Sequence, residues 1–225
     1  VIGGDMIDDP AGPGQLEAFR RIAALSDTPL HCAPGNHDIC WDAAVPTEDS
    51  IEWYREQFGP EHSTVTADLG NSTKLTVVMV NSAVLDQPRA VQGSFEAEMA
   101  WLEGALGARA PGPTIVVSHH PPFLEDPAEG PNYWNIPPAR RRPFLELLAD
   151  SGVDLLLCGH RHRNDSVHYG DMEIVTTSAV GFPLGTDPPG FRVVEVGGSD
   201  ISHSYYPLSD PGWEEIGGPP EPAST

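Results

Sequence analysis

The chain has 225 residues, which is enough to bury the core of one domain. It carries 33 acidic and 12 basic residues, and its formal net charge of -21 repels polyanions, which argues against a nucleic-acid partner. No apolar run approaches the roughly 20 residues that a membrane-spanning helix needs, so we expect no membrane partner.

Three cysteines, Cys32, Cys40 and Cys158, lack the spacing of a zinc ribbon or of a disulfide-rich secreted domain. We expect them to be reduced thiols, with a disulfide between Cys32 and Cys40 as the alternative. We expect a cytoplasmic location for the protein.

Strand-like runs alternate with helical periodicity along the first two thirds of the chain. The runs that end in polar or glycine-rich turns are Val1–Ile2, Leu75–Val80, Ile115–Val117 and Val153–Leu157. Apolar residues recur on one helical face over residues 15–25, 94–106 and 138–149. This alternation predicts an α/β layered domain, in which polar residues beyond the carboxyl ends of the strands gather in one crevice.

The pattern changes from Met172 onward to short strands and turns. Segments Glu173–Thr177, Phe191–Val196 and Ile201–Tyr206 suggest an antiparallel run, so we expect a second sheet there. Residues 210–225 are rich in proline, glycine and acids and have no periodicity. They predict a mobile tail that follows a single domain over residues 1–209.

Four polar motifs follow the expected strands. In chain order they are Gly4-Asp5-Met6-Ile7-Asp8, Gly35-Asn36-His37-Asp38, His119-His120-Pro121-Pro122 and Gly159-His160-Arg161-His162. A glycine before the polar residue allows the sharp turn that directs a side chain into a shared pocket. Carboxylate, amide oxygen and imidazole suit Mn, Fe or Zn, whereas the absence of a cysteine ligand argues against a structural zinc site.

His160 and His162 are two residues apart, so in an extended segment their side chains would point the same way, about 6.6 Å apart. We therefore expect them to serve adjacent metal ions. Two ions about 3.5 to 4 Å apart are used for in-line displacement at phosphorus, and a carboxylate such as Asp5 can bridge them. Such a pair supplies hydroxide near neutral pH.

Together and in this order, the four motifs resemble the calcineurin-like metallophosphoesterase superfamily. The resemblance implies an α/β fold of two packed mixed β-sheets flanked by helices, with a dinuclear site at the strand ends. It also implies the metal ligands: a bridging Asp5, one site completed by Asn36, His119 and His160, and His162 at the other. His120 competes with His119, which we favour because it directly follows the strand.

The same resemblance gives His37 and Asp8 roles in catalysis. His37 would not bind metal but would contact the substrate phosphate and stabilise or protonate the leaving oxygen. Asp8 would orient the His37 imidazole, as a carboxylate partner fixes a tautomer.

A narrower resemblance covers segments outside the motifs, over residues 77–85, 123–137, 158–164 and 176–196. These are similar to the calcineurin-like phosphoesterase domain-containing protein group, relatives of a eukaryotic Ser/Thr protein phosphatase. This implies a phosphate-ester substrate and phosphomonoesterase activity, with phosphoproteins as substrates. Asp9 and Asp38 depart from the main Ser/Thr phosphatases, which carry arginine and glutamate there.

Other functions agree with parts of the pattern. A cyclic nucleotide phosphodiesterase shares the Gly35–Asp38 and His119–Pro122 motifs and is the enzymatic alternative. A DNA nuclease ranks third because the charge opposes it. A binding scaffold with a decayed metal site is the non-enzymatic alternative, although the ligands in the four motifs are present. The loop Asn132–Asn135 packs its aromatics or, alternatively, forms a substrate wall.

The superfamily begins with an Asp-x-His motif upstream of the first motif seen here. We therefore expect Asp5, Asn36, His119 and His160 to bind one metal firmly. The second ion, held by Asp5 and His162, is expected to bind weakly to the chain as printed. We also expect the natural protein to be longer at its amino end, where a central strand would carry the missing motif.

Overall fold

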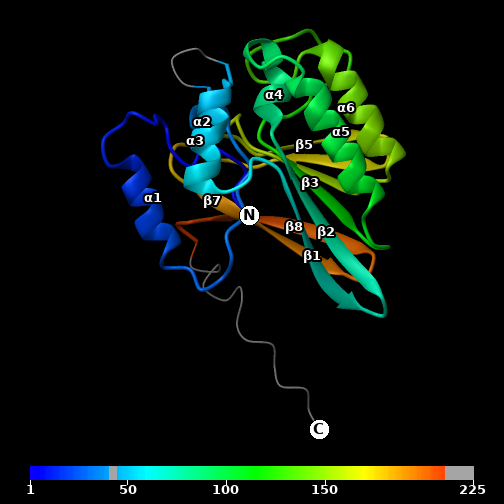
Figure 1. Ribbon diagram of the computed structural model, residues 1–225. Helices are drawn as coiled ribbons and strands as arrows, with labels where there is room; N and C mark the ends of the chain where they lie inside the picture. Colours follow the sequence, from blue (N-terminus) through cyan, green and yellow to red (C-terminus); the bar gives the residue numbers. More distant parts are fainter. Residues whose placement is uncertain (41–44, 211–225) are drawn as a thin grey trace.

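A six-stranded mixed sheet forms the centre of the molecule (Figure 1). The computed structural model describes residues 1–40 and 45–210. The strands of this sheet are β1 (Ser63–Gly70), β2 (Thr73–Val80), β3 (Thr114–Ser118), β4 (Leu155–Cys158), β5 (Asp165–Tyr169) and β6 (Met172–Thr176). Their spatial order is β1-β2-β3-β4-β6-β5.

The four central strands β2, β3, β4 and β6 run parallel, and the edge strands β1 and β5 pair antiparallel to their neighbours. Parallel strands end at the same edge of a sheet, so the residues that follow β2, β3 and β4 lie side by side. This edge positions the His119–Pro122 and Gly159–His162 motifs, which follow β3 and β4.

The two faces of the sheet are covered differently because side chains alternate along each strand. Val116 of β3 and Leu156 of β4 pair in register and pack on the helical side. Ile115 and Leu155 point the other way and pack with partly buried residues such as Val194 from the second sheet.

The helical layer and the second sheet lie on opposite faces (Figure 1). The helical layer consists of α4 (Ser82–Asp86), the 3-10 turn η1 (Pro88–Ala90), α5 (Ser94–Gly107) and α6 (Pro138–Asp150). The second sheet is the antiparallel pair β7 (Gly190–Gly197) and β8 (Asp200–Pro207).

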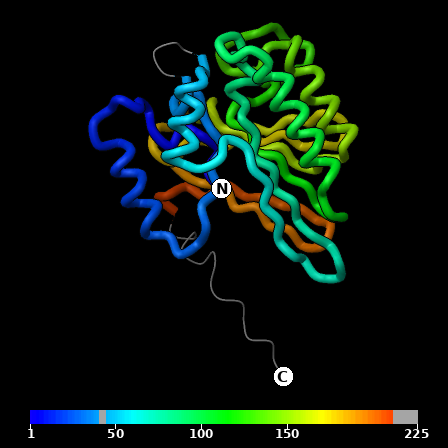
Figure 2. Tube along the Cα trace, in the orientation of Figure 1, coloured from blue at the N-terminus to red at the C-terminus, as the bar shows by residue number. Residues whose placement is uncertain are grey.

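Three further helices lie to one side of the sheet (Figure 1). They are α1 (Gln15–Ala23), α2 (Asn36–Ile39) and α3 (Glu48–Phe58). Ile39 and Tyr54 form a small core with Ala83 of α4, which ties this group to the main domain. In Figure 2 the first residues run beside the segment before α2, where Ile2 and Cys32 form a parallel bridge.

The predicted α/β class with two sheets is confirmed, and the three predicted helices correspond to α1, α5 and α6. One strand was placed wrongly. Residues 172–176 do not begin the second sheet but form β6, which pairs parallel with β4. Ile174 and Val175 are both buried, on opposite faces, which is typical of a central parallel strand.

The remaining expectations concern the first two residues, the cysteines, membrane helices and the tail. Residues 1–2 form only the isolated bridge and not a named strand. The three cysteines are free, so the alternative disulfide is not formed. None of the helices in the described part of the chain has the length and apolar character needed to cross a membrane. From residue 211 on, the predicted tail lies outside the described residues.

Candidate metal centre

His119 forms the centre of the site, directly after β3. Its Nε2 atom lies 3.1 Å from Asn36 Oδ1 and 3.1 Å from Asp5 Oδ2. Its Nδ1 atom lies 2.8 Å from the Gly3 carbonyl, which only accepts, so Nδ1 carries the hydrogen. A neutral ring then presents the Nε2 lone pair to two oxygen acceptors. A cation or an added proton is needed there, and these three donor types suit a divalent metal ion.

The amide of Asn36 is held in place by Tyr133. The Tyr133 hydroxyl interacts with the Asn36 side chain, and Asn36 Oδ1 lies 3.1 Å from His119 Nε2. The amide can serve both neighbours because its oxygen and its NH₂ group are separate hydrogen-bonding groups. Tyr133 therefore helps to position the Asn36 amide at the site.

Two motif glycines are required by the close approach of these side chains. A Cβ atom on Gly4, whose φ is +107°, would lie 2.3 Å from His119 Nδ1. A Cβ on Gly35 would lie 2.0 Å from Asp5 Oδ1. Any larger residue at either position would push apart the groups that converge on the site.

Three predicted ligands have left-handed backbone conformations. Asp5, His160 and His162 have φ values of 54°, 65° and 53°. Such conformations cost of order 1–3 kcal/mol each and concentrate at functional sites. They also correct the expectation of an extended segment: β4 ends at residue 158, and the two histidines lie on a turn, where the period-two argument for their side chains does not apply.

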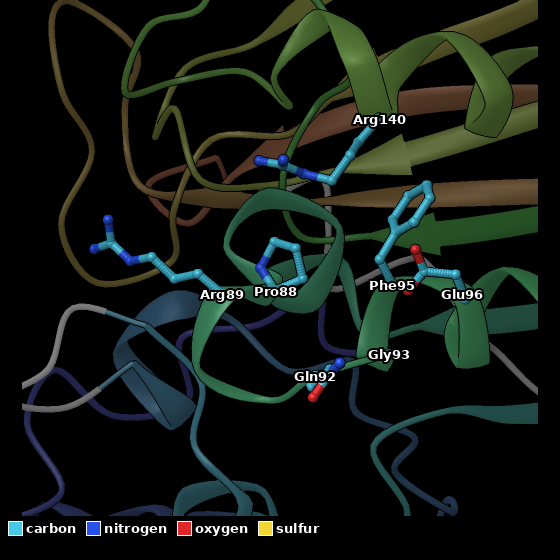
Figure 3. A pocket seen from close by; sticks show the side chains of 7 residues that line it. All are labelled: Pro88, Arg89, Gln92, Gly93, Phe95, Glu96 and Arg140. Carbon is cyan, nitrogen blue, oxygen red and sulfur yellow. The ribbon is translucent and has the colours of Figure 1, made fainter.

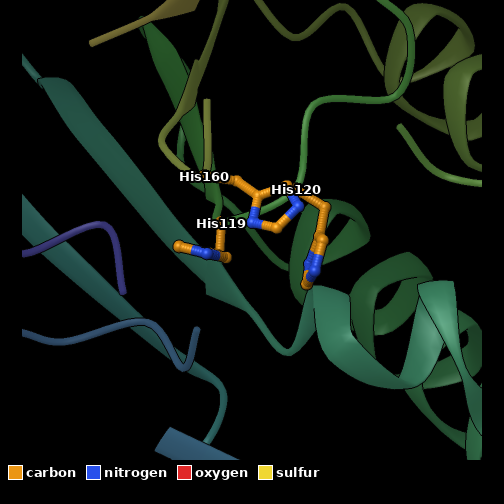
Figure 4. A group of neighbouring side chains, drawn as sticks. All are labelled: His119, His120 and His160. Atoms are coloured by element: carbon orange, nitrogen blue, oxygen red, sulfur yellow. The ribbon is translucent and has the colours of Figure 1, made fainter. Parts of the chain in front are cut away.

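His160 lies beside His119 and His120, and Figure 4 shows the three rings together. One ligand atom from each lies within 4.8 Å of the others. His120 differs from His119 because its Nδ1 lies 2.9 Å from Ser82 Oγ, whereas Nε2 of His119 faces Asp5 and Asn36. The contacts therefore favour His119 as the ligand that follows β3.

Burial and neighbouring charges set the protonation of the site. Burial alone would raise the pKa of Asp5, but attraction to His119 overcomes this and lowers it to about 2. Burial opposes a charge on His119, yet Asp5 raises its pKa. Burial and repulsion from His119 lower the pKa of His160 to about 4. His160 is thus neutral at pH 7, as a metal-binding imidazole must be.

Asp38 connects two motifs, a role that sequence reasoning missed. Its Oδ2 atom accepts hydrogen bonds of 2.8 Å from the backbone N–H groups of Asp5 and Gly35. Burial and repulsion from Asp5 raise the pKa of Asp38 to about 7, so Asp5 retains the negative charge of the pair. The acidic residue at the fourth position of the Gly35–Asp38 motif was the sequence signal that could have identified this role of Asp38.

His37 lies at the start of α2, with its imidazole partly exposed. Its Nδ1 atom is 2.8 Å from the Asp8 carbonyl oxygen and 3.3 Å from the Asp8 carboxylate, whose side chain is 85% exposed. Asp8 thus contacts the His37 imidazole, with its backbone carbonyl as a nearer partner than the carboxylate that the sequence predicted. The backbone N–H of His37 also donates to Asp5 Oδ1, at 3.0 Å.

His162 lies outside the cluster of three histidines found among the described residues. Its Nδ1 donates to the carbonyl of Phe182. After burial and His119, His162 makes a smaller contribution to the lowered pKa of His160. The structure thus brings Asp5, Asn36, His119 and His160 into one group and places His162 at its margin.

A buried arginine shapes the loop beside the site. Arg141 of α6 donates to the carbonyl oxygens of Pro127, Glu129 and Ile136, at 2.8 to 3.0 Å. The Glu129 carboxylate in turn accepts from three backbone N–H groups of residues 124–126. These bonds hold the loop that carries Tyr133.

Replacing Arg141 with methionine is expected to lower the free energy of unfolding by about 2 to 4 kcal/mol, because three carbonyls lose a charged donor. The matched control is Arg142→Met, whose side chain is 80% exposed and pairs with Glu146. We expect that control to change stability far less, because an exposed ion pair contributes little. Urea unfolding of both variants measures this, and equal losses would contradict the role given to Arg141.

A separate surface pocket of about 570 Å³ lies where α5 and α6 begin (Figure 3). Its lining includes Arg89, Gln92, Phe95 and Arg140 and none of the predicted site residues. Arg140 donates to the Leu85 carbonyl, so its guanidinium already serves the end of α4. We assign no chemistry to this pocket.

Comparison with known proteins places the chain among phosphoesterases. The sequence profile of the calcineurin-like phosphoesterase family matches residues 1–164. The serine/threonine-protein phosphatase CPPED1 of Bos taurus is 30% identical over 221 residues. That match covers 93% of this chain and 67% of the bovine protein.

Two solved structures share the fold. GAP50, the anchor in the inner membrane complex of Plasmodium, has a TM-score of 0.61 at 16% identity, over 79% of this chain and 61% of its own. A dimetal phosphatase from Danio rerio has a TM-score of 0.53 at 13% identity, over 90% of this chain and 82% of its own. Identities this low show similarity of fold alone.

Proposed function

The chain belongs to the calcineurin-like phosphoesterase family and is a metal-dependent phosphoesterase, and from this premise we propose that it hydrolyses phosphomonoesters, with phosphoserine and phosphothreonine in proteins as substrates. The observation that carries the proposal is the convergence of Asp5, Asn36 and His119. The name of the bovine relative supports a phosphoprotein substrate.

Four residues would hold one metal ion, and Asp5 with His162 would contribute to a second. The four are Asp5, Asn36, His119 and His160. Bound Mn, Fe or Zn ions supply a hydroxide nucleophile from water at neutral pH and neutralise charge on the phosphoryl oxygens. Asp5 supports this role because its carboxylate stays ionised, and the Gly3 carbonyl supports it by fixing the tautomer of His119.

His37 is suited to act on the leaving group. Because its Nδ1 donates to the Asp8 carbonyl, its Nε2 is free to contact the phosphate ester. In the imidazolium form, Nε2–H can hydrogen-bond the phosphoryl group and then pass its proton to the departing oxygen. The backbone N–H of His37 donates to Asp5 Oδ1, which holds this residue beside the expected metal ligands.

The test compares a monoester and a diester with the same leaving group, p-nitrophenyl phosphate and bis-p-nitrophenyl phosphate. After chelation we expect hydrolysis of both to fall to the background rate, since the nucleophile depends on the metal. Re-addition of Mn, Fe or Zn one at a time should restore it, with kcat/KM at least about tenfold higher for the monoester.

A preference for the diester would overturn the monoester assignment and favour a cyclic nucleotide phosphodiesterase. Activity that survives exhaustive chelation, with metal content measured by elemental analysis, would contradict the metal-dependent chemistry. Calcium serves as the control ion, because its large, oxygen-rich coordination shell does not suit an imidazole site.

A further inference from the structure

Two aromatic side chains are exposed beside the metal centre. Tyr133 is 63% exposed and Phe182 is 70% exposed. Among the large hydrophobic residues that are exposed in the described part of the chain, the others are all aliphatic. Aromatic side chains normally bury most of their surface, so an exposed pair at a functional site indicates contact with a ligand.

The backbone carbonyl of each aromatic residue contacts one histidine of the Gly159–His162 motif. His160 Nε2 lies 2.9 Å from the Tyr133 carbonyl, and their ring centroids are 4.9 Å apart. His162 Nδ1 donates to the Phe182 carbonyl, and those ring centroids are 6.4 Å apart. The two aromatic residues come from different loops and are both positioned by residues of the site itself.

Both loops are held by internal hydrogen bonds. Arg141 and Glu129 fix the loop of Tyr133, as described above. In the loop of Phe182, the backbone N–H of Leu184 and the hydroxyl of Ser178 both donate to the His162 carbonyl, at 2.9 and 3.0 Å. A ligand that binds between fixed aromatic residues loses little binding energy to the ordering of the protein.

The surrounding charge favours an apolar ligand over an acidic one. The chain carries a formal net charge of -21, which opposes acidic groups beside the phosphate. Arg161, next to His160, is already ion-paired with Asp165.

We propose that Tyr133 and Phe182 form two apolar walls of the substrate site and bind apolar side chains that flank the phosphoserine or phosphothreonine of a peptide. The proposal rests on the proposed function, since it names the class of protein substrate that the same site takes. The phosphate enters the metal centre, and the neighbouring apolar side chains lie against the two rings.

The experiment compares two phosphoserine peptides that differ only in the residues on either side, leucine in one and aspartate in the other. We expect kcat/KM to be at least about tenfold higher for the leucine peptide. The double variant Tyr133→Ala with Phe182→Ala should reduce this ratio toward one. Phe182→Ala alone keeps the carbonyl that binds His162, so it should raise KM for the leucine peptide more than KM for the aspartate peptide.

Two variants serve as controls, and metal content is measured for all of them. Tyr133→Phe keeps the ring but loses the bond to Asn36, so the ratio between peptides should persist even where kcat falls. Leu25→Ala removes an 81% exposed apolar side chain on the segment after α1 and should change nothing. A ratio near one in the unaltered protein, or a ratio that survives the double variant, would overturn the proposal.

Failure of the proposed function has a different signature. If p-nitrophenyl phosphate is hydrolysed but neither phosphopeptide is, then the protein is not a peptide phosphatase, and the walls proposed for a peptide are overturned with it. If both peptides are hydrolysed equally well, only the role of the two aromatic residues is refuted.

Discussion

Replacement of His37 with alanine is expected to lower kcat by about 10²- to 10⁴-fold while the metal stays bound, the range typical of a lost general acid or oxyanion partner. His37 is not a member of the histidine cluster found among the described residues, and its imidazole contacts Asp8. Its loss should therefore affect the chemical step. The measurements are kcat on p-nitrophenyl phosphate and metal content by elemental analysis.

Two comparisons sharpen this prediction. His31→Ala removes a half-buried histidine outside the motifs and should leave kcat unchanged within about twofold. Asp8→Asn should cost much less than His37→Ala, because the Asp8 carbonyl makes the nearer contact and survives the substitution. Loss of metal from His37→Ala would show that this residue is a ligand and would contradict its assignment.

Replacement of His160 with alanine is expected to reduce metal affinity by at least about 100-fold, more than the loss typical when an outer partner of a ligand is removed. His160 is buried, is neutral at pH 7 and lies next to His119. A water-exposed side chain therefore cannot replace it as a ligand. Activity should fall with the metal and return in part at high metal concentration. Metal titration followed by activity measurement tests both.

His168 provides the matched control for His160. It lies on the edge strand β5 with an exposed side chain, so His168→Ala should retain full metal affinity. If His160→Ala bound metal as tightly as the unaltered protein, His120 would be the better candidate for the ligand role, since it completes the same cluster.

The sequence alone determined the class of the fold and the residue types at the site. The apolar runs that end before His119 and Gly159 identify strand ends, because burial patterns are encoded in neighbouring residues. The ligand roles of Asp5 and His119 are predictions from the motifs, and the structure places the two side chains 3.1 Å apart.

Tertiary structure decided what depends on residues far apart in the chain. Ile174 and Val175 showed that β6 is buried on both faces, but only its pairing with β4 places it in the first sheet. The role of Asp38 needs the backbone of Asp5, 33 residues away. The positions of Tyr133 and Phe182 beside the site involve contacts of their carbonyls with His160 and His162, and local propensity does not encode which distant group satisfies a carbonyl.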